Sequence, residues 1–140
     1  MTTKNNLSRF LEAQDGVYDT ALKEVRNGRK TGHWMWYIFP QISGLGFSET
    51  SRFYAIKNQA EAAEYLNHEI LGTRLIEVSA ELLNLQTNNP VEIFGSIDSL
   101  KLKSSMTLFS LLENSQPLFQ KVLDKFYGGK KDENTVQLLK

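Results

Sequence analysis

The chain has 140 residues, of which 41% are hydrophobic and 23% charged, and its formal net charge is zero. A chain of this length and composition can bury the core of one globular domain. It contains no cysteine, which excludes disulfides, thiolate nucleophiles and cysteine-ligated zinc. No apolar run is long enough for a transmembrane helix, and the N-terminus lacks the apolar stretch of a signal peptide, so a cytoplasmic location is expected.

The charge is unevenly distributed along the chain. Residues 1–57 carry 8 Lys or Arg against 5 Asp or Glu, residues 58–100 carry 1 Arg against 7 acids, and residues 101–140 carry 7 Lys against 4 acids. Solvated helix faces explain this pattern. The alternative is that the first and last thirds meet around an anionic ligand. Duplex-DNA binding normally requires an excess of basic residues, so the composition argues against DNA as a partner.

The N-terminal third begins with a polar segment, residues 1–6, which is expected to be flexible. The sequence predicts a single domain over 7–140. Its first helix covers 7–14, and Asp15 is well suited to cap a second helix. That helix ends at Asn27-Gly28, because glycine favours the backbone conformation that closes a helix.

A continuous apolar and aromatic run follows at 33–39. Pro40 ends it, because the residue before a proline is disfavoured in the α conformation. With helical signals on both sides, a short buried helix is predicted here. The glycines at 44–46 then form a loop, and Ser48 or Thr50 caps the next helix.

The second half of the chain is divided by caps, prolines and glycines. The predicted helices are 59–66 after Asn58, 69–85, a short helix from Pro90 to Gly95, 98–112 capped by Asp98 or Ser99, 117–127 from Pro117, and a terminal helix after Asp132. The chain as a whole has about eight short helices and no convincing strand pair. The predicted fold class is all-α, a compact multihelical single domain.

Several strings of residues carry a resemblance to a known family. They are GRKTGHWMWYIFPQ at 28–41, GLGFS at 44–48, SSMTLF at 104–109 and YGG at 127–129. The chain resembles the bacterial family catalogued as domain of unknown function 1810, over nearly its full length. This resemblance implies a compact helical bundle and no established activity. The label "calpastatin" found on some members does not fit, because such an inhibitor is a long, disordered chain.

A second, looser resemblance concerns the helical family that acts on ADP-ribosylated or riboside-phosphate compounds. It depends on the string FYAIK at 53–57 and on the order of Asp98, Lys101 and Met106. Ser51 and Arg52 stand where that family has its acid. No catalytic residue is therefore carried over.

The segment 28–48 combines positive charge, aromatic rings and glycines, which suits a planar or phosphate-bearing ligand. Arg29 and Lys30 supply the charge, although cations are also favoured at the C-terminus of a helix. His33 is the candidate catalytic residue, because histidine can act as acid or base near neutral pH. The alternative is that its ring bonds a backbone carbonyl and anchors the aromatic run.

Four further side chains of this segment are candidate ligand-binding residues. Trp34 and Trp36 are two residues apart and cannot share a helix face, so one can be in the core while the other lines a cleft. Gln41 and Ser48 can hydrogen-bond a polar ligand. The loop at 44–48 could hold an anion through its backbone N–H groups, but the GxGxS pattern is a weak signal and ordinary turn geometry explains it better.

The other candidate group is on the helix that follows Asp98. Lys101, Ser104 and Ser105 are spaced i, i+3 and i+4 and therefore share one face. An ammonium group with two hydroxyls suits a phosphate or a carboxylate. The alternative is close helix packing through small residues.

These residues lead to a main hypothesis and two alternatives. The main hypothesis is a helical domain that binds a nucleotide-like or phosphorylated small molecule. Whether it is an enzyme stays open; hydrolysis of a glycosidic or phosphate linkage, on an ADP-ribose-type substrate, is the reaction class considered. No cofactor is expected, and two histidines without a carboxylate cluster argue against a metal. The alternatives are a non-enzymatic protein-interaction module and a single-stranded RNA binder that uses tryptophan stacking.

Overall fold

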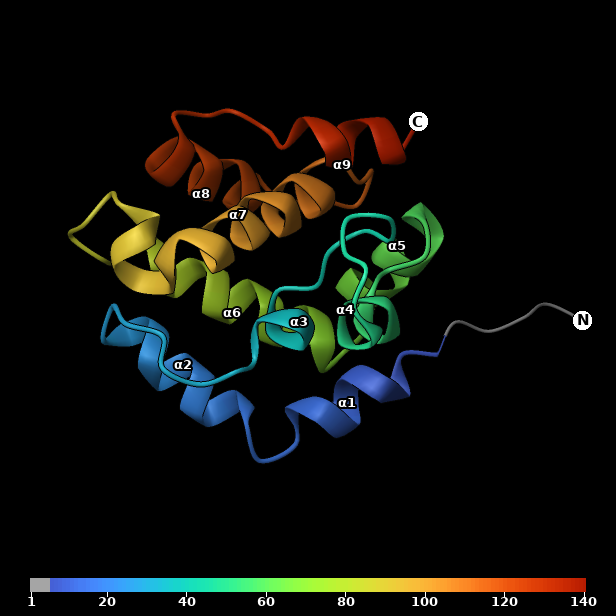
Figure 1. Cartoon of the computed structure of the whole chain (residues 1–140), viewed down its shortest axis with the longest axis horizontal. Coiled ribbons are helices and arrows are strands. Elements are labelled where there is room, and N and C mark those ends of the chain that lie inside the picture. Colours follow the sequence, from blue (N-terminus) through green and yellow to red (C-terminus); the bar gives the residue numbers. More distant parts are fainter. Residues whose placement is uncertain (1–5) are drawn as a thin grey trace, which may run out of the picture.

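Nine α-helices and the segments that connect them form residues 6–140, the part of the chain that the computed structural model describes (Figure 1). They are α1 (Ser8–Gln14), α2 (Tyr18–Arg26), α3 (Met35–Ile38), α4 (Glu49–Tyr54), α5 (Gln59–Asn67), α6 (Leu71–Leu83), α7 (Pro90–Ser110), α8 (Pro117–Tyr127) and α9 (Glu133–Leu138). The predicted all-α fold class is confirmed. The segment 1–6, predicted to be flexible, lies outside the described residues except for Asn6.

Helix boundaries that depend on local chemistry agree with the sequence. Ser48, Asn58 and Asp132 each accept a hydrogen bond from the backbone N–H three residues further along, at 2.9–3.1 Å. They are the N-caps of α4, α5 and α9. Pro90 and Pro117 are the first residues of α7 and α8, where the missing N–H costs nothing.

The start of α2 differs from the prediction. Asp15 is not the N-cap of α2: Gly16 has a φ of +74°, which inserts a turn, and the helix begins only at Tyr18. The break expected near residue 95 is present: the backbone of Gly95 (φ 82°, ψ 169°) is not helical, so α7 consists of two helical segments on either side of it. Glycine tolerates this conformation, so helical structure resumes directly after it.

The buried apolar side chains form one continuous cluster, to which α1–α3 and α5–α8 contribute. Trp34, Phe39 and Tyr65 are among its largest members and are at most 1% exposed. In Figure 1, α1 and α2 lie along one side of the molecule and α7, α8 and α9 along the other, with α3 between them. The aromatic run at 33–39 is therefore in the middle of the fold.

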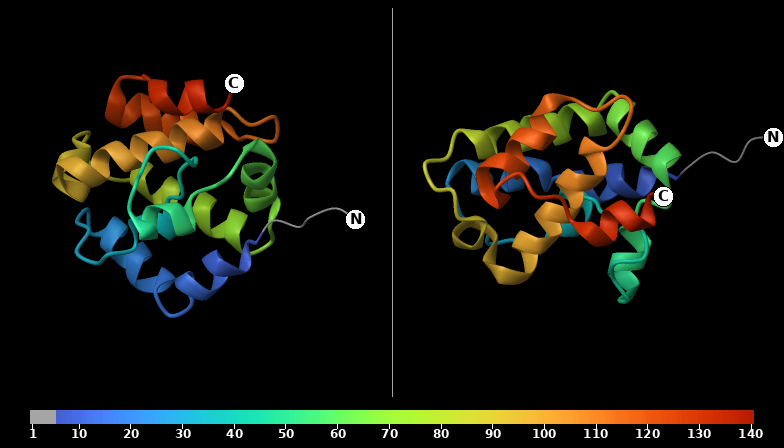
Figure 2. Two further views of the ribbon diagram at one scale, coloured as in Figure 1. Left: turned by 45° about the vertical axis from the view of Figure 1, so that its right-hand side comes forward. Right: turned by 90° about the horizontal axis from the view of Figure 1, so that it is seen from above.

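A projecting segment, here called the 42–56 loop, contains α4. Its two ends are joined by a parallel bridge between Ile42 and Ile56: Ser43 N–H donates to the carbonyl of Ile56, and Ile56 N–H to that of Gln41, each at 2.8 Å. In the right-hand view of Figure 2, α4 and the chain before it stand out from the body, beside α9. The loop is thus held closed where it leaves the core.

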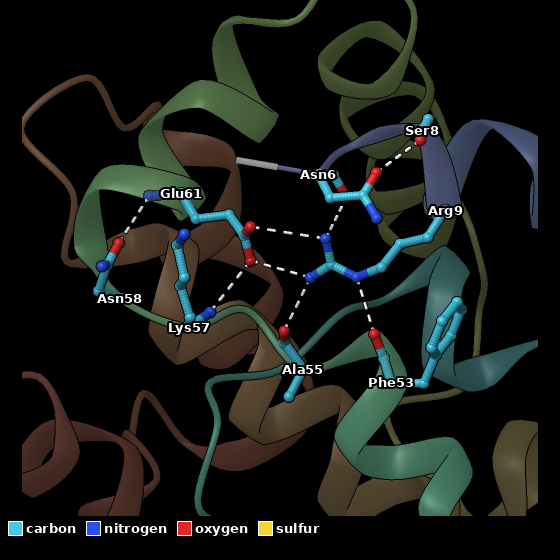
Figure 3. Close-up of polar contacts among 8 residues, drawn as sticks. All are labelled: Asn6, Ser8, Arg9, Phe53, Ala55, Lys57, Asn58 and Glu61. Atoms are coloured by element: carbon cyan, nitrogen blue, oxygen red, sulfur yellow. Dashed lines mark hydrogen bonds and ion pairs between the residues drawn. The ribbon is translucent and has the colours of Figure 1, made fainter. Parts of the chain in front are cut away.

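A buried ion pair fastens α1 to this loop and to α5 (Figure 3). The Arg9 guanidinium lies 2.9 Å from the Glu61 carboxylate and also donates to the carbonyls of Phe53 and Ala55, at 2.8 and 2.9 Å. Glu61 in turn accepts the N–H of Lys57 at 3.0 Å. Both charged side chains are almost completely buried, 9% and 2% exposed. Their pairing offsets the free-energy cost of removing the two charges from water.

Gln14 fixes α3, the helix that carries the aromatic run. Its Nε2 donates to the carbonyl of Tyr37 at 2.7 Å and to the hydroxyl of Tyr65 at 3.0 Å. Its Oε1 accepts from Arg74 at 3.2 Å. This buried amide has partners on three segments and so sets the position of α3 relative to α1, α5 and α6.

Candidate functional site

The chain between α2 and α3 is organised by Glu24. One carboxylate oxygen accepts the N–H groups of Thr31 and Gly32, at 2.6 and 2.8 Å, and the indole N–H of Trp34 at 3.0 Å. Burial acts to raise the pKa of the Glu24 carboxyl, but these hydrogen bonds outweigh it and hold the pKa below its ordinary value. The charged carboxylate therefore fixes the segment that presents Lys30 and His33.

Asp98 holds two lysines that come from different parts of the chain. Its Oδ2 lies 2.9 Å from Nζ of Lys30, and its Oδ1 lies 3.0 Å from Nζ of Lys101, one turn further along α7. Partial burial acts to raise the pKa of Asp98, but hydrogen bonds from both lysines outweigh it and lower the pKa. The carboxylate is thus ionised at neutral pH, and the three groups together carry one net positive charge.

Lys30 and Lys101 are held in further ways. The backbone N–H of Lys30 donates to the carbonyl of Ile93 at 2.8 Å, which ties the segment to α7. The Lys30 ammonium also donates to the carbonyl of Gly32. Nζ of Lys101 lies 3.9 Å from the ring centroid of Trp36, within the range of a cation–π contact. Both cations are therefore fixed before any ligand arrives.

These side chains surround a depression of about 290 Å³, here called the charged hollow. It is lined by Lys30, His33, Met35, Trp36, Thr50, Asp98 and Lys101. His33 is exposed on its rim. The walls come from the segment before α3, from α3 itself, from α4 and from α7. A depression with two cations, one imidazole and an indole has the chemistry to hold an anion next to a planar group.

A second depression, here called the loop cavity, lies beside the charged hollow and has a volume of about 430 Å³. Trp36 lines both. Most of the wall is formed by the 42–56 loop, including Ser43, Arg52 and Tyr54. Gln41 also lines it, and its side-chain Nε2 is buried without a hydrogen-bond partner.

Of the ten residues singled out from the sequence, four line the charged hollow: Lys30, His33, Trp36 and Lys101. Gln41 is in the neighbouring loop cavity. Trp36 is partly exposed while Trp34 is 1% exposed in the core, which agrees with the prediction that one is buried and the other lines a cleft. A role for Trp34 in stacking on a ligand or on RNA does not fit this burial.

The other four do not line either depression. The Arg29 side chain is exposed, and Ser48 is occupied as the N-cap of α4. Ser104 donates to the carbonyl of Leu100 at 3.1 Å and to Asp132 at 3.2 Å, and Ser105 is 0% exposed. From Leu102 to Phe109 only Lys103 is not buried, because α5, α8 and α9 pack around this part of α7. The two serines therefore allow close helix packing, which was the alternative explanation.

Sequence reasoning missed Glu24 and the central role of Asp98. The i, i+3 spacing of Asp98 and Lys101 was a readable signal for a surface pair. Nothing in the sequence indicates that Lys30 reaches the same carboxylate. The role of Glu24 was equally hidden, since its partners are backbone N–H groups of an irregular segment.

Residues 6–140, which the structure describes, contain neither a metal-binding cluster nor a membrane-spanning helix. In this range no group of three or more His, Asp or Glu side chains is arranged to hold a metal ion. Within the same range, no helix combines the length and the apolar character needed to cross a membrane.

Comparisons with known proteins give the relationships of the chain. Its structure is similar to the crystal structure of the conserved hypothetical protein Rv1873 from Mycobacterium tuberculosis, with a TM-score of 0.93, 46% sequence identity and 96% of each chain covered. No curated protein matches the chain. A sequence model described as "Protein of unknown function (DUF1810)" matches residues 4–139. The match covers nearly the whole chain, and the protein therefore belongs to the DUF1810 family.

Proposed function

We propose that the protein binds a phosphorylated, nucleotide-like small molecule in the charged hollow. The observation that carries this proposal is that Lys30, His33 and Trp36, all within residues 30–36, meet Lys101 of α7 at one depression. A cytoplasmic location, which the sequence predicts, would give the protein access to such metabolites.

The charges of the hollow support an anionic ligand. Each lysine ammonium has three N–H donors. The shared carboxylate of Asp98 takes one donor from each, and the carbonyl of Gly32 takes a second from Lys30. Donors remain for phosphate oxygens, and the net charge of the three groups is positive. Because the lysines are already fixed, ligand binding would cost little additional side-chain entropy.

A catalytic role in this site would fall to His33, because its exposed imidazole lines the charged hollow. The reaction class to assay is hydrolysis of a phosphate or glycosidic linkage, with ADP-ribose as the first substrate. His33→Ala should then abolish turnover, while the protein still binds the ligand. Equal turnover by the wild type and by this variant would remove the catalytic role.

The binding proposal is tested by calorimetric titration with inorganic phosphate, ribose 5-phosphate, AMP and ADP-ribose. Lys101→Met should lower the affinity for these anions about tenfold to a hundredfold, because a charge-assisted hydrogen bond contributes about 1.5–3 kcal/mol. The matched control is Lys103→Met, which removes the same charge from the same helix. Lys103 lines neither depression, and its Nζ lies 6.0 Å from the ring centroid of Tyr127.

Two results would contradict this proposal. One is the absence of binding by every anion of the panel at millimolar concentration. The other is an equal loss of affinity in the Lys101 and Lys103 variants, which would mean that the protein responds only to overall charge.

A non-enzymatic interaction module is the second candidate, and exposed apolar side chains favour it. Ile97 and Leu100 are 71% and 64% exposed on α7, and Phe47 is 81% exposed in the 42–56 loop. Apolar side chains grouped on a surface are typical of protein-docking sites. The Ile97→Ser/Leu100→Ser double variant should then lose a partner that both the wild type and His33→Ala retain in co-purification.

A further inference from the structure

The loop cavity is partly open to solvent, and its wall is held in place at two points. Its base is held by the bridge between Ile42 and Ile56. On its outer side Gly46 packs so closely on α4 that a Cβ there would lie 2.6 Å from Oγ of Ser51. Only glycine allows this approach, and the close packing keeps the cavity wall in place.

The side-chain amide of Gln41 lacks a partner in this cavity. Its Nε2 is buried and makes no hydrogen bond within the described residues. The backbone of Gln41 is fixed, because its carbonyl accepts the N–H of Ile56 at 2.8 Å. A buried amide donor without a partner costs free energy. Because the nitrogen is buried, the Gln41 side chain would turn toward the cavity to reach an acceptor atom of a ligand, and the new hydrogen bond would remove this cost.

The aromatic side chains of the cavity indicate the shape of that ligand. Trp36 and Tyr54 line it, and Trp36 also lines the charged hollow. Aromatic side chains stabilise planar rings by stacking, and an amide can bond to the edge of such a ring. A molecule with an anionic end and a planar heterocyclic end therefore matches the two depressions on either side of Trp36.

We propose that the loop cavity holds the nucleobase of a nucleoside monophosphate and that Gln41 bonds to the edge of the base. This inference rests on the proposed function in one respect: the phosphate of the same ligand would lie in the charged hollow. Trp36 would then separate the base from the phosphate, and the base would add affinity that a sugar phosphate lacks.

The test compares ribose 5-phosphate with AMP, GMP, CMP and UMP, and with the four matching nucleosides, by calorimetric titration at one ionic strength. At least one nucleotide should bind about tenfold more tightly than ribose 5-phosphate, as expected for one added hydrogen bond with stacking. Gln41→Met should remove this advantage and leave the affinity for ribose 5-phosphate unchanged. Lys101→Met should weaken nucleotide and sugar phosphate to the same extent.

Thermal unfolding of the Gln41→Met variant gives an independent measurement. Because the amide donor has no partner in the free protein, its replacement by an apolar side chain of similar length should leave the melting temperature unchanged or raise it. A clear fall in melting temperature would mean that the amide has a structural role, and would contradict the inference.

The outcomes separate the inference from the proposed function. Nucleotides that bind no better than ribose 5-phosphate, or an advantage that survives Gln41→Met, would overturn the inference alone. Nucleosides that bind in a Gln41-dependent way, with no contribution from Lys101, would support the inference and contradict the phosphate site. If no compound of the panel binds, both fall.

Discussion

Asp98 is the residue on which the geometry of the charged hollow depends. Its two carboxylate oxygens each hold one lysine, at 2.9 and 3.0 Å, and fix the distance between the two ammonium groups. The Lys101 partner is visible in the sequence as an i, i+3 pair. The Lys30 partner is not, because only the packing of the segment after α2 against α7 brings it within reach.

Gly72 shows how one residue can determine the packing of two helices. A Cβ at this position in α6 would lie 1.9 Å from the backbone carbonyl oxygen of Leu66 in α5. We expect Gly72→Ala to lower the free energy of unfolding by about 3 kcal/mol, because the two helices would have to separate.

Urea denaturation measures this change. Thr73→Ala is the control, since residue 73 is exposed and adjacent, and its effect should remain within about 0.5 kcal/mol. Similar unfolding midpoints for the two variants would mean that α5 and α6 can adjust to a methyl group without cost.

The buried Arg9–Glu61 pair attaches the helix α1 to its neighbours. The pair links α1 to α5 and to the end of the 42–56 loop, with both side chains almost completely buried. Arg9→Ala should destabilise the protein by about 3 kcal/mol, because it leaves the Glu61 carboxylate buried and unpaired. The Arg9→Ala/Glu61→Ala double variant should lose less than the sum of the single changes.

An exposed ion pair of the same chain supplies the comparison. Arg26 and Glu81 lie 3.2 Å apart, but their side chains are 49% and 23% exposed. Arg26→Ala should therefore lower the free energy of unfolding by less than about 1 kcal/mol.

Denaturant titrations of the Arg9 and Glu61 variants measure the coupling within the buried pair. Additive effects of the two single changes would show that the buried pair acts as two independent residues.

The helix boundaries could be predicted from the sequence, but the rotation of each helix against its neighbours could not, and the difference has a physical cause. Caps such as Asn58 and Asp132 and the helix starts at Pro90 and Pro117 depend on atoms within a few residues, so they could be predicted. The periodicity of α7 showed which side chains share a face. It could not show how the helix is rotated against its neighbours, and Ser104 and Ser105 face the packing contacts.

The ionisation of two carboxylates makes the free energy of unfolding of the whole molecule sensitive to acid. The pKa values of Glu24 and Asp98 lie below their ordinary values of 4.5 and 3.8, so the folded chain binds these protons more weakly than the unfolded chain. Their contribution is complete above the ordinary values and is lost as the pH falls through the lower pKa values of the folded state.

Urea unfolding between pH 7 and pH 3 tests this dependence. The two groups should contribute no change between pH 7 and pH 5.5, and stability should decline at pH values below about 4.5. Glu24→Gln should lower the stability at pH 7 and reduce the slope of the acid decline, because the neutral amide no longer titrates. An unchanged slope in this variant would show that Glu24 does not contribute.

The closed base of the 42–56 loop has a consequence for how this part of the architecture can vary. Since two backbone hydrogen bonds seal the point where the loop leaves the core, the residues between them can be exchanged as a cassette. Chimaeras that carry this cassette from a relative should keep the scaffold of the recipient and change only the wall that the loop supplies to the loop cavity.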